Sequence, residues 1–382
     1  MVEIPKVLHV GKYYPPFKGG METFVGDLVK AQRLSGRWKP LVLAHGRPRK
    51  DSPFGVRLVP FLGEVSHAPL SPGFPWALYQ MIRSERPRLL HLHLPNTSAF
   101  WALMLRCARH LPWVVHWHAD VVPSRIDRRL AVLYRLYRPL EKAVLRRAAA
   151  VIATSQDYLA GSRPLQGHGL KCHVVPLGID PERLPSPDGL PVARAESLWG
   201  SGRSLRVLAA GRLSYYKGHE VLLRAAVWVP GCRVILVGDG ERRSALEKLR
   251  ADLALTDRVT LAGFLPDMDL WALMATADLF CLPSLEKTEA FGVVLLEARR
   301  YGVPVVASDI PESGVGWVVR TASCGALVPP GDTAALARIL SNFSEDPSPL
   351  HAFRRHMARG FPQKFHIGCV AERLAAIYAQ CV

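Results

Sequence analysis

Short runs of β-branched and other apolar residues alternate along this chain with longer stretches in which apolar residues recur at helical spacing. In the first half these runs are Val7–Gly11, Pro40–Ala44, Val56–Pro60, Leu89–Leu92, Trp113–Trp117 and Ala150–Ala153. Strands separated by helices pair in parallel, because a helical crossover returns the chain to the same edge of the sheet. The pattern therefore predicts an α/β fold with doubly wound parallel sheets, whose ligands bind beyond the carboxyl ends of the strands.

The same alternation resumes in the second half, with runs at Leu205–Ala210, Val234–Gly240, Val259–Phe264 and Ala277–Leu282. A chain of 382 residues is long enough for two domains, each with its own apolar core. Between the halves, residues 181–203 are rich in Pro, Gly and Ser, a composition that favours a linker. We expect one sheet in each domain.

Three features bear on where the chain works. Residues 1–6 lack the basic and then apolar order of a signal peptide, and no apolar run of about 18 residues is present to span a membrane. The seven cysteines are scattered and never in Cys-x-x-Cys spacing, which argues against a zinc site or a disulfide framework. We expect a protein of the cytoplasm.

The segment from Pro283 to Glu297 changes from a buried strand to helical spacing, which begins at Phe291. Glu289 therefore lies at the mouth of a helix, where unpaired N–H groups beside Gly292 favour a phosphate. Glu297 is close enough to the helix start to reach the same crevice, and a carboxylate suits sugar hydroxyls. The alternative is that Glu289 is a helix cap and Glu297 a solvated residue.

Two further segments place phosphate-binding groups after a strand. Arg212 and Lys217 lie in a loop between a strand and a helix, where Arg can grip phosphate oxygens in pairs and Lys adds a point charge. Gly19 and Gly20 precede the first helix, and two glycines permit close approach of the backbone to an anion. Taken alone, these features are also typical of surface charge and of an ordinary turn.

His118 and Asp120 follow the strand Trp113–Trp117. A histidine at this place is often a structural hydrogen-bonding group, but it also faces the ligand edge of the sheet. We expect His116 to alternate to the other side of the strand. His91, His93 and His116 raise the question of a metal, but they are scattered over two predicted strands without a recognisable ligand spacing, so we expect structural roles.

Several of these segments together resemble the donor site of the retaining glycosyltransferases of family 4. They are Gly-Arg-x4-Lys-Gly at 211–218, Glu-x7-Glu at 289–297 followed by Gly-Val-Pro-Val-Val-Ala-Ser at 302–308, and the strand-then-His segment at 115–120. The resemblance implies the GT-B fold, in which two Rossmann-like domains face each other across a cleft. It implies an acceptor-side domain at 1–180, the linker at 181–203, a nucleotide-sugar domain at 204–360, and a last helix at 361–382 that crosses back to the first domain.

The resemblance also assigns roles to the site residues. It implies that Arg212 and Lys217 bind the pyrophosphate, that Glu289 and His118 contact the hexose, and that Glu297 contacts the ribose. The remaining donor-binding positions that it implies are Gly19, Gly20, Phe264, Phe291 and Gly292. No Asp-x-Asp pair accompanies these segments, so we expect a metal-independent reaction without a cofactor, and Glu289 positions the sugar.

The function implied is transfer of a hexose to a lipid-linked oligosaccharide or another cell-envelope glycan precursor, with retained configuration. Mannose from GDP-mannose is favoured over other hexoses from UDP-sugars. The alternatives are a GT-B nucleotide-sugar epimerase and a non-catalytic sugar-nucleotide binder at a membrane surface. An intact set of donor-site residues argues against the binder, because a binder need not keep all of them.

The formal net charge of +17 attracts phosphorylated substrates, anionic lipid and nucleic acid alike. Around Pro139, a predicted helix places cations on one side; these are Arg128, Arg135, Arg138, Lys142 and Arg146. The roughly opposite side is apolar and contains Leu130, Leu133, Tyr134, Tyr137, Val144 and Leu145. The pattern fits either a surface helix on its own core or a helix on the anionic inner face of the plasma membrane. Pro139 is expected to kink or split this helix. No nucleic-acid-binding signature is present.

Overall fold

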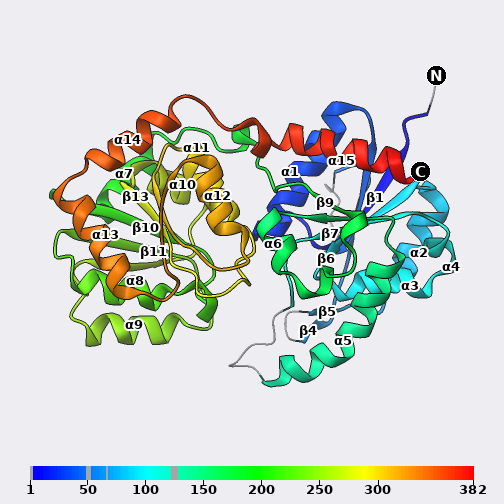
Figure 1. Ribbon diagram of the computed structural model, residues 1–382, viewed down its shortest axis with the longest axis horizontal. Coiled ribbons are helices and arrows are strands. Elements are labelled where there is room, and N and C mark those ends of the chain that lie inside the picture. Colours follow the sequence, from blue (N-terminus) through cyan, green and yellow to red (C-terminus); the bar gives the residue numbers. More distant parts are fainter. Residues whose placement is uncertain (1–2, 49–52, 66–67, 122–127) are drawn as a thin grey trace. The chain divides into compact units, whose positions relative to one another are not determined.

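The computed structural model describes residues 3–48, 53–65, 68–121 and 128–382, with side chains for all of these except 128–132. The chain divides into two compact units (Figure 1). The first contains residues 1–179 and 364–382, and the second contains residues 180–363. Each unit is built on its own parallel sheet, as the alternation of strands and helices predicts.

In the described part of the first unit, the strands of the main sheet are ordered β3-β2-β1-β6-β7-β8-β9. They are β1 (Lys6–Tyr13), β2 (Lys39–His45), β3 (Val56–Val59), β6 (Leu89–Leu94), β7 (Trp113–Trp117), β8 (Ala150–Ala153) and β9 (Cys172–Val174). A small antiparallel pair, β4 (Gly63–Val65) and β5 (Ala68–Leu70), lies outside this sheet. The sequence predicted all of these strands except β9 and the β4–β5 pair.

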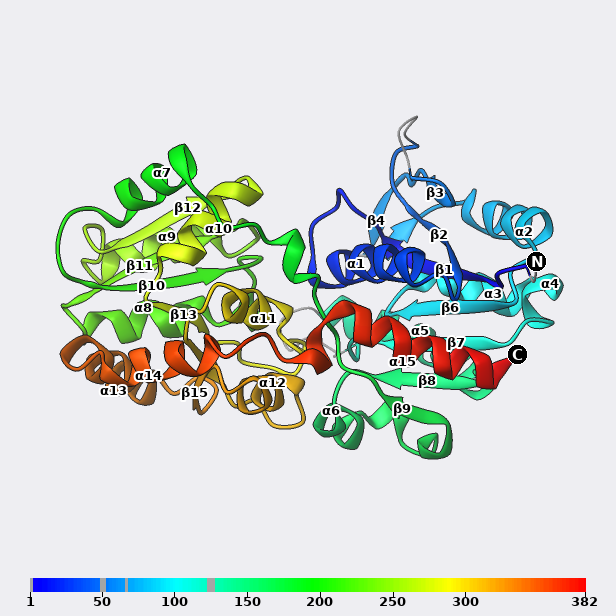
Figure 2. The same ribbon diagram turned by 90° about the horizontal axis from the view of Figure 1, so that it is seen from above.

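The helices of this unit are α1 (Gly20–Ser35), α2 (Phe74–Glu85), α3 (Trp101–Met104), α4 (Arg106–Arg109), α5 (Arg128–Arg147), α6 (Gln156–Gly161) and α15 (Ile367–Cys381). Three short 3-10 helices, η1 (Thr97–Phe100), η2 (Arg163–Leu165) and η3 (Gly169–Lys171), lie between them. Helix α15 packs against α1 and β7, so the end of the chain returns to the first unit as expected (Figure 2). In the described residues, no helix combines the length and the apolar character needed to cross a bilayer.

In the second unit, the described strands are ordered β12-β11-β10-β13-β14-β15. They are β10 (Leu205–Ala210), β11 (Cys232–Val237), β12 (Val259–Gly263), β13 (Leu279–Leu282), β14 (Val305–Ser308) and β15 (Gly325–Val328). The helices are α7 (Gly189–Trp199), α8 (His219–Val227), α9 (Arg243–Asp252), α10 (Asp267–Thr276), α11 (Val293–Arg300), α12 (Gly314–Ala322), α13 (Thr333–Glu345) and α14 (Ser348–Met357). Short 3-10 helices lie at η4 (Pro181–Arg183), η5 (Tyr215–Lys217) and η6 (Gln363–Phe365).

In both sheets, the side on which successive strands are added changes at one internal strand. From β10 the chain adds β11 and β12 on one side and then returns to place β13 on the other side of β10. In the first sheet, β1 and β6 are related in the same way. Because the loops at such a reversal point diverge, they leave a crevice at the carboxyl edge of the sheet where ligands bind. Gly19 follows β1, Lys217 follows β10 and Glu289 follows β13, so the predicted residues occupy these loops.

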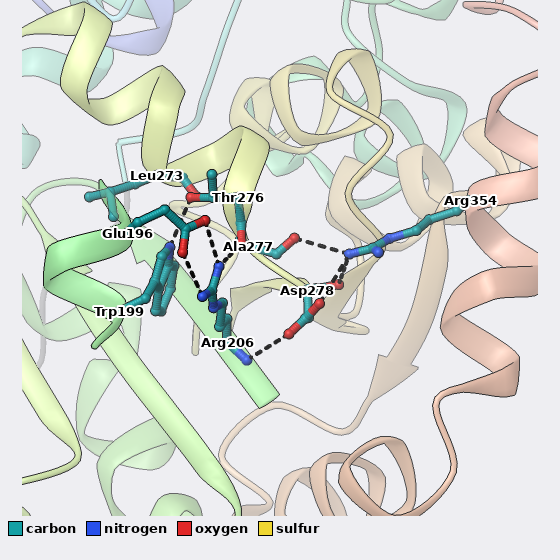
Figure 3. Close-up of polar contacts among 8 residues, drawn as sticks. All are labelled: Glu196, Trp199, Arg206, Leu273, Thr276, Ala277, Asp278 and Arg354. Carbon is teal, nitrogen blue, oxygen red and sulfur yellow. Dashed lines mark hydrogen bonds and ion pairs between the residues drawn. The ribbon is translucent and has the colours of Figure 1, made fainter. Parts of the chain in front are cut away.

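The segment 181–203 is not an open linker, which corrects the expectation from composition. It contains η4 and helix α7, and it belongs to the second unit. Figure 3 shows how α7 is held. The indole of Trp199 donates a hydrogen bond to Thr276 Oγ1 at 2.9 Å, and the guanidinium of Arg206 on β10 donates to both carboxylate oxygens of Glu196 at 2.9 and 2.7 Å. Apolar burial of Trp199, together with these bonds, overrides the weak helix propensity of the segment.

Candidate active site

Two loops of the second unit pack directly against each other at the carboxyl edge of its sheet. Gly218, in the loop after β10, has φ +66, and a Cβ atom there would lie 2.0 Å from the carbonyl oxygen of Pro283 in the loop after β13. The N–H of Leu285 donates to the carbonyl of Tyr216 at 2.7 Å. A glycine is required at 218 because of both its backbone conformation and this close approach. The two donor-site segments of the sequence therefore meet.

This contact brings Lys217 and Glu289 together. Lys217 Nζ lies 2.5 Å from Glu289 Oε2, and the side chains are 11% and 12% exposed. The hydroxyl of Ser284 donates to the same carboxylate oxygen at 3.3 Å. Burial lowers the pKa of the Lys217 ammonium, but the charge of Glu289 and the neighbouring Tyr216 outweigh burial, so the pKa lies above its ordinary value. The two side chains form a nearly buried ion pair.

The amino end of α11 follows this pair in the chain. Helix α11 begins at Val293, two residues later than the spacing predicts, because Gly292 is its N-cap in the left-handed conformation with φ +77. The side chain of Phe291 is buried, and its ring lies near Trp317 with the ring centroids 6.3 Å apart. Phe291 therefore packs in the interior beneath the loop, and the backbone N–H groups at the start of the helix lie at 292–293.

Arg212 and Phe264 lie on the same edge of the second sheet. Arg212 is exposed in the loop after β10, and Phe264, directly after β12, is 65% exposed. Hydrogen bonds join the intervening loops: Leu213 N–H donates to the carbonyl of Asp239 at 3.0 Å, and Gly238 N–H donates to the carbonyl of Gly263 at 2.8 Å. The exposed cation and the exposed aromatic ring therefore belong to one continuous edge with the Lys217–Glu289 pair.

Glu297 lies in the middle of α11 and has a partner that the sequence did not reveal. Arg183 Nη2 donates to Glu297 Oε1 at 3.0 Å, and the two side chains are 27% and 20% exposed. Arg183 is in η4, more than a hundred positions earlier in the chain. The carboxylate expected to meet the ribose is thus oriented by a cation.

One Asp-x-Asp sequence does occur in the chain, at 267–269, outside the segments of the donor-site resemblance. It forms the first turn of α10. Asp269 accepts two hydrogen bonds from the guanidinium of Arg194, at 2.8 and 2.5 Å. The pairing with Arg194 on α7 gives Asp269 a role in holding that helix.

In the first unit, Gly19 and Gly20 are exposed at the start of the sixteen-residue helix α1. Gly19 is the N-cap, and its carbonyl accepts from Thr23 N–H at 3.0 Å. The carboxylate of Glu22 folds back over this position, since a Cβ on Gly19 would lie 2.3 Å from Glu22 Oε2. A carboxylate at a helix start is stabilised by the helix dipole, so Glu22 is favourably placed beside Gly19.

His118 follows β7 and is 5% exposed. His116 lies on the same side of the strand, so the expectation that it points to the opposite face is wrong. Side chains two residues apart in a strand share a face, and the two imidazole rings stack 4.3 Å apart with an angle of 7° between their planes. Asp120 has a structural role, since its Oδ1 accepts from the Trp117 indole at 2.8 Å and from the Ser162 hydroxyl at 2.6 Å.

Five buried histidines form one cluster on this face of the sheet. They are His9 on β1, His91 and His93 on β6, His116 on β7, and His118. Parallel pairing sets His9 opposite His91 and His93 opposite His116, which brings together side chains that are far apart in the sequence. Burial lowers the pKa of His9 to about 4 and that of His118 to about 3, and it lowers those of the other three well below the ordinary value. All five are therefore neutral at pH 7.

Two groups of three histidines bring one nitrogen from each ring within 4.8 Å of one another: His9, His91 and His93, and His93, His116 and His118. A metal needs in-plane lone pairs that converge on a single point. Here the rings of the second group are stacked at angles of 7° to 25°, and neighbouring nitrogens are joined by hydrogen bonds such as His93 Nδ1 to His118 Nε2 at 3.0 Å. This geometry favours a chain of neutral imidazoles.

A cavity of about 690 Å³ lies at the opposite, amino edge of the second sheet. Its lining includes Asp278, Arg299 and Arg354. The guanidinium of Arg299 donates to three carbonyls, those of Ala322, Met357 and Gly360. Arg354 donates to the carbonyl and the carboxylate of Asp278 (Figure 3). These cations anchor chain segments, so the cavity lacks the arrangement of groups found at the carboxyl edge.

The exposed side of α5 carries Arg135, Arg138, Lys142 and Arg146, while Val144 and Leu145 are fully buried. Arg128 belongs to the helix, but its side chain lies outside the described residues. Leu136 and Leu140 are 72% and 42% exposed among the cations. Pro139 lies inside a continuous helix and does not split it.

Both units match sequence models of glycosyltransferases. Residues 19–178 match the glycosyl transferase 4-like domain, and residues 200–359 match the glycosyl transferases group 1. A phosphatidyl-myo-inositol mannosyltransferase of Mycobacterium leprae is 31% identical over 335 residues, which cover 84% of this chain and 83% of the relative. The D-rhamnosyltransferase WbpZ of Pseudomonas aeruginosa is 28% identical over 374 residues, 94% of this chain and 92% of the relative.

Among solved structures, the Anabaena protein Alr3699/HepE in complex with UDP and glucose superposes with a TM-score of 0.77 at 24% identity, covering 98% of this chain and 100% of that one. The likeness establishes the architecture as GT-B. The chain belongs to the group 1 glycosyltransferases of family 4. It is a glycosyltransferase.

Proposed function

We propose that the protein is a retaining hexosyltransferase that moves a hexose, with mannose favoured, from a nucleoside-diphosphate sugar to a lipid-linked oligosaccharide or another cell-envelope glycan precursor. The observation that carries the proposal is the contact of the two loops that join Lys217 to Glu289 beside the start of α11. A cation, a carboxylate and a helix terminus on one sheet edge suit a sugar that leaves from a diphosphate.

The reaction breaks the bond between the anomeric carbon and the phosphate oxygen and forms a bond from that carbon to an acceptor hydroxyl oxygen. The hydroxyl proton leaves with the departing diphosphate. Negative charge grows on the phosphate oxygens as the bond breaks, and Arg212, Lys217 and the amino end of α11 are proposed to stabilise it. Fixed charges and dipoles of this kind need no reorganisation during the reaction.

Glu289 has a positioning and electrostatic role in this proposal. Its carboxylate pairs with Lys217 at 2.5 Å. When a diphosphate binds, its oxygens offer Lys217 a second anionic partner, and the Glu289 carboxylate becomes free to accept hydrogen bonds from the hexose hydroxyls. Glu297 is proposed to accept from the ribose, with Arg183 fixing its orientation, and His118 is proposed to contact the hexose.

The choice of mannose and of an envelope acceptor is supported by the relatives, whose names describe a phosphatidyl-myo-inositol mannosyltransferase and a D-rhamnosyltransferase. The Anabaena structure contains UDP and glucose, which keeps UDP beside GDP as the nucleotide of the donor. A screen of GDP, UDP and ADP by thermal shift tests the proposal, because a ligand that binds only the folded state raises the melting temperature. One nucleotide should do so, and transfer from its sugar should then be detected. Failure of all three would reject the proposal.

Transfer is proposed to be independent of a metal and of any other cofactor, because Arg212 and Lys217 would supply the positive charge that the diphosphate needs. Adding EDTA to a transfer assay should leave the rate unchanged. A strict requirement for Mg²⁺ would contradict this part of the proposal.

Peripheral contact with anionic lipid at the inner face of the plasma membrane is proposed for α5. Its exposed cations surround Leu136 and Leu140, so the helix offers both charge and apolar side chains to a bilayer surface. Replacing Arg135, Arg138 and Lys142 with Gln should weaken binding to anionic vesicles by roughly 100-fold, at about 1 kcal/mol per charge. The matched control replaces three cations of the second unit, Arg224, Lys248 and Arg338. Equal loss in both variants would show that net charge alone drives binding.

The two alternatives give different products. A nucleotide-sugar epimerase would release a free epimerised sugar without an acceptor, and a non-catalytic binder would show a thermal shift without turnover. The ion pair of Lys217 with Glu289 favours an enzyme over a binder, because a carboxylate beside the phosphate-binding cation weakens simple anion binding.

A further inference from the structure

The buried histidines of the first unit belong to one continuous line of hydrogen bonds. From one end it runs through His118 Nε2 to His93 Nδ1 at 3.0 Å, His93 Nε2 to His9 Nδ1 at 3.0 Å, and His9 Nε2 to Gln32 Oε1 at 2.8 Å. Beyond Gln32 it continues through the hydroxyl of Tyr378 to His91 and ends at His116. In the described part of the chain, His118 Nδ1 at one end and His116 Nε2 at the other have no hydrogen-bond partner.

A neutral imidazole has one N–H donor and one lone pair, so each ring in such a line must donate in the same direction as its neighbour. The carbonyl of Gln32 only accepts, and it therefore requires a proton on His9 Nε2. His9 Nδ1 must then accept from His93 Nε2, and His93 Nδ1 must accept from His118 Nε2. The tautomer of His118 thus follows from the orientation of an amide three residues further along the line.

The distances on the other arm indicate which way this amide faces. The hydroxyl of Tyr378 lies 2.5 Å from His91 Nδ1, and such a short distance is typical of an O–H donor. The distance of 3.2 Å between Gln32 Nε2 and the Tyr378 oxygen lies in the range of an N–H donor. Tyr378 therefore donates to His91 and accepts from Gln32, which leaves the Gln32 carbonyl facing His9.

We propose that Gln32 is a positioning residue that holds His118 as the Nε2–H tautomer, so that the unpaired Nδ1 accepts a hydrogen bond from a hydroxyl of the transferred hexose. This inference rests on the proposed function, which places the hexose at His118. An unpaired buried nitrogen carries a desolvation penalty that a hydroxyl donor relieves. In the opposite tautomer Nδ1 would carry a proton, and this acceptor would be lost.

Burial supports the neutral state that the line requires. Gln32 is 2% exposed and Tyr378 is fully buried, so water does not compete for these groups. Phe24 of α1 closes the cluster over His116 and His118, with ring centroids 5.1 and 5.6 Å away. The amide comes from α1 and the phenol from α15, and the packing of these two helices brings both groups to the line.

The test compares Gln32→Met with Tyr378→Phe in the full chain labelled with ¹⁵N-histidine. Long-range ¹H–¹⁵N spectra report the tautomer of each ring, and the His118→Asn variant identifies the His118 signals. Gln32→Met removes the acceptor for His9, so His118 should become a mixture of tautomers. Tyr378→Phe removes a buried hydroxyl from the same cluster but leaves the Gln32 carbonyl on His9, so His118 should keep its tautomer.

Kinetics supply the second readout. Gln32→Met should lower kcat/KM for the sugar donor by roughly 3- to 10-fold, the effect of one neutral hydrogen bond. Binding of the nucleoside diphosphate alone, which has no hexose, should not change. The inference is overturned if Gln32→Met leaves the His118 tautomer unchanged, if Tyr378→Phe changes it equally, or if the tautomer changes without any effect on transfer. A wild-type protein that binds no nucleotide would instead contradict the proposed function, and the spectra would still decide the role of Gln32.

Discussion

The two units treat buried polar groups in opposite ways. In the first unit, five imidazoles lie in the interior as neutral rings joined by hydrogen bonds, because burial lowers their pKa. In the second, Lys217 and Glu289 remain charged and offset each other at 2.5 Å. Both arrangements avoid an isolated buried charge, one by losing the charge and the other by pairing it.

The difference matters for what each cluster can do. In a line of neutral imidazoles, a ring in the other tautomer breaks a hydrogen bond to its neighbour. The line therefore favours a single arrangement of protons. In an ion pair at the mouth of a helix, the cation can bind an incoming phosphate, and the carboxylate then needs another hydrogen-bond donor such as a sugar hydroxyl. The first cluster is suited to positioning, and the second to binding and releasing a charged group.

Acid should affect the first unit most, and this is the largest effect we expect. The pKa of His9 in the folded protein is about 4 and that of His118 about 3, both below the ordinary value of 6.5. Between pH 6.5 and the pKa of the folded protein, these histidines bind more protons in the unfolded chain than in the folded one. Their contribution to the free energy of unfolding is therefore fully present above pH ~6.5 and falls as the pH drops toward 4. The contribution of each of these two rings to the free energy of unfolding should fall by on the order of 3 kcal/mol. Hydrogen exchange measured by mass spectrometry at pH 7, 5.5 and 4.5 should show β6 and β7 losing protection first.

The second unit provides the control for this experiment. It contains one buried histidine with a comparable shift, His219, whose pKa burial lowers to about 4. Its Lys217 has a raised pKa, so that contribution to stability is present below the unfolded pKa and is lost as the pH rises through the folded one. Strands β10 and β13 should therefore be the more acid-resistant ones. Earlier loss of protection there would reverse the comparison.

The next largest effect should come from Glu289→Gln. The substitution keeps the shape and a hydrogen-bond acceptor for Lys217 but removes the charge that the proposed mechanism places near the hexose. Transfer should fall by roughly 100- to 1,000-fold, the loss typical of one preorganised electrostatic group. The matched control is Glu286→Gln, which removes a carboxylate from the same loop. Full activity of Glu289→Gln would reject the assigned site.

The sequence predicted most of the fold and much of the candidate site in the second unit. Strand β10 has the predicted bounds, and β12 and β13 lie within the predicted runs, because apolar runs between glycine- and proline-containing turns report burial directly. The contact of Lys217 with Glu289 was also accessible, since both follow strands that flank the reversal of the sheet.

The face on which His116 lies was predicted wrongly, although the signal for it was present. His91 and His93, like His116 and His118, are two residues apart, and a period of two places each pair on one face. What no local pattern gives is the order of strands, which sets β1 beside β6 and β6 beside β7. Gln32 and Tyr378 join the cluster only through the packing of α1 on α15, and Arg183 reaches Glu297 only after folding.

Lys217→Met should have a smaller effect on transfer than Glu289→Gln but should also destabilise the second unit. It removes one cation from the diphosphate, while Arg212 and the start of α11 remain, so affinity for the nucleotide should fall by roughly 10- to 100-fold. It also leaves the Glu289 carboxylate almost buried without its cation, which should lower the free energy of unfolding by about 1–3 kcal/mol. Isothermal titration and denaturant unfolding measure the two effects. A nucleotide affinity equal to that of the wild type would show that Lys217 serves the fold alone.

The smallest effect should come from Glu297→Gln, because Arg183 still has an amide oxygen to donate to and a neutral acceptor can still meet a ribose hydroxyl. We expect a roughly 3- to 10-fold increase in KM for the sugar donor with little change in kcat, since a contact with the ribose is made equally in the ground state and the transition state. Arg183→Gln should produce a similar increase by releasing the carboxylate from its 3.0 Å contact. The double variant should then be no worse than either single one, because both act through the same bond. Additive losses would mean that Arg183 and Glu297 contact the donor separately, and the cation would be a binding group that acts in its own right.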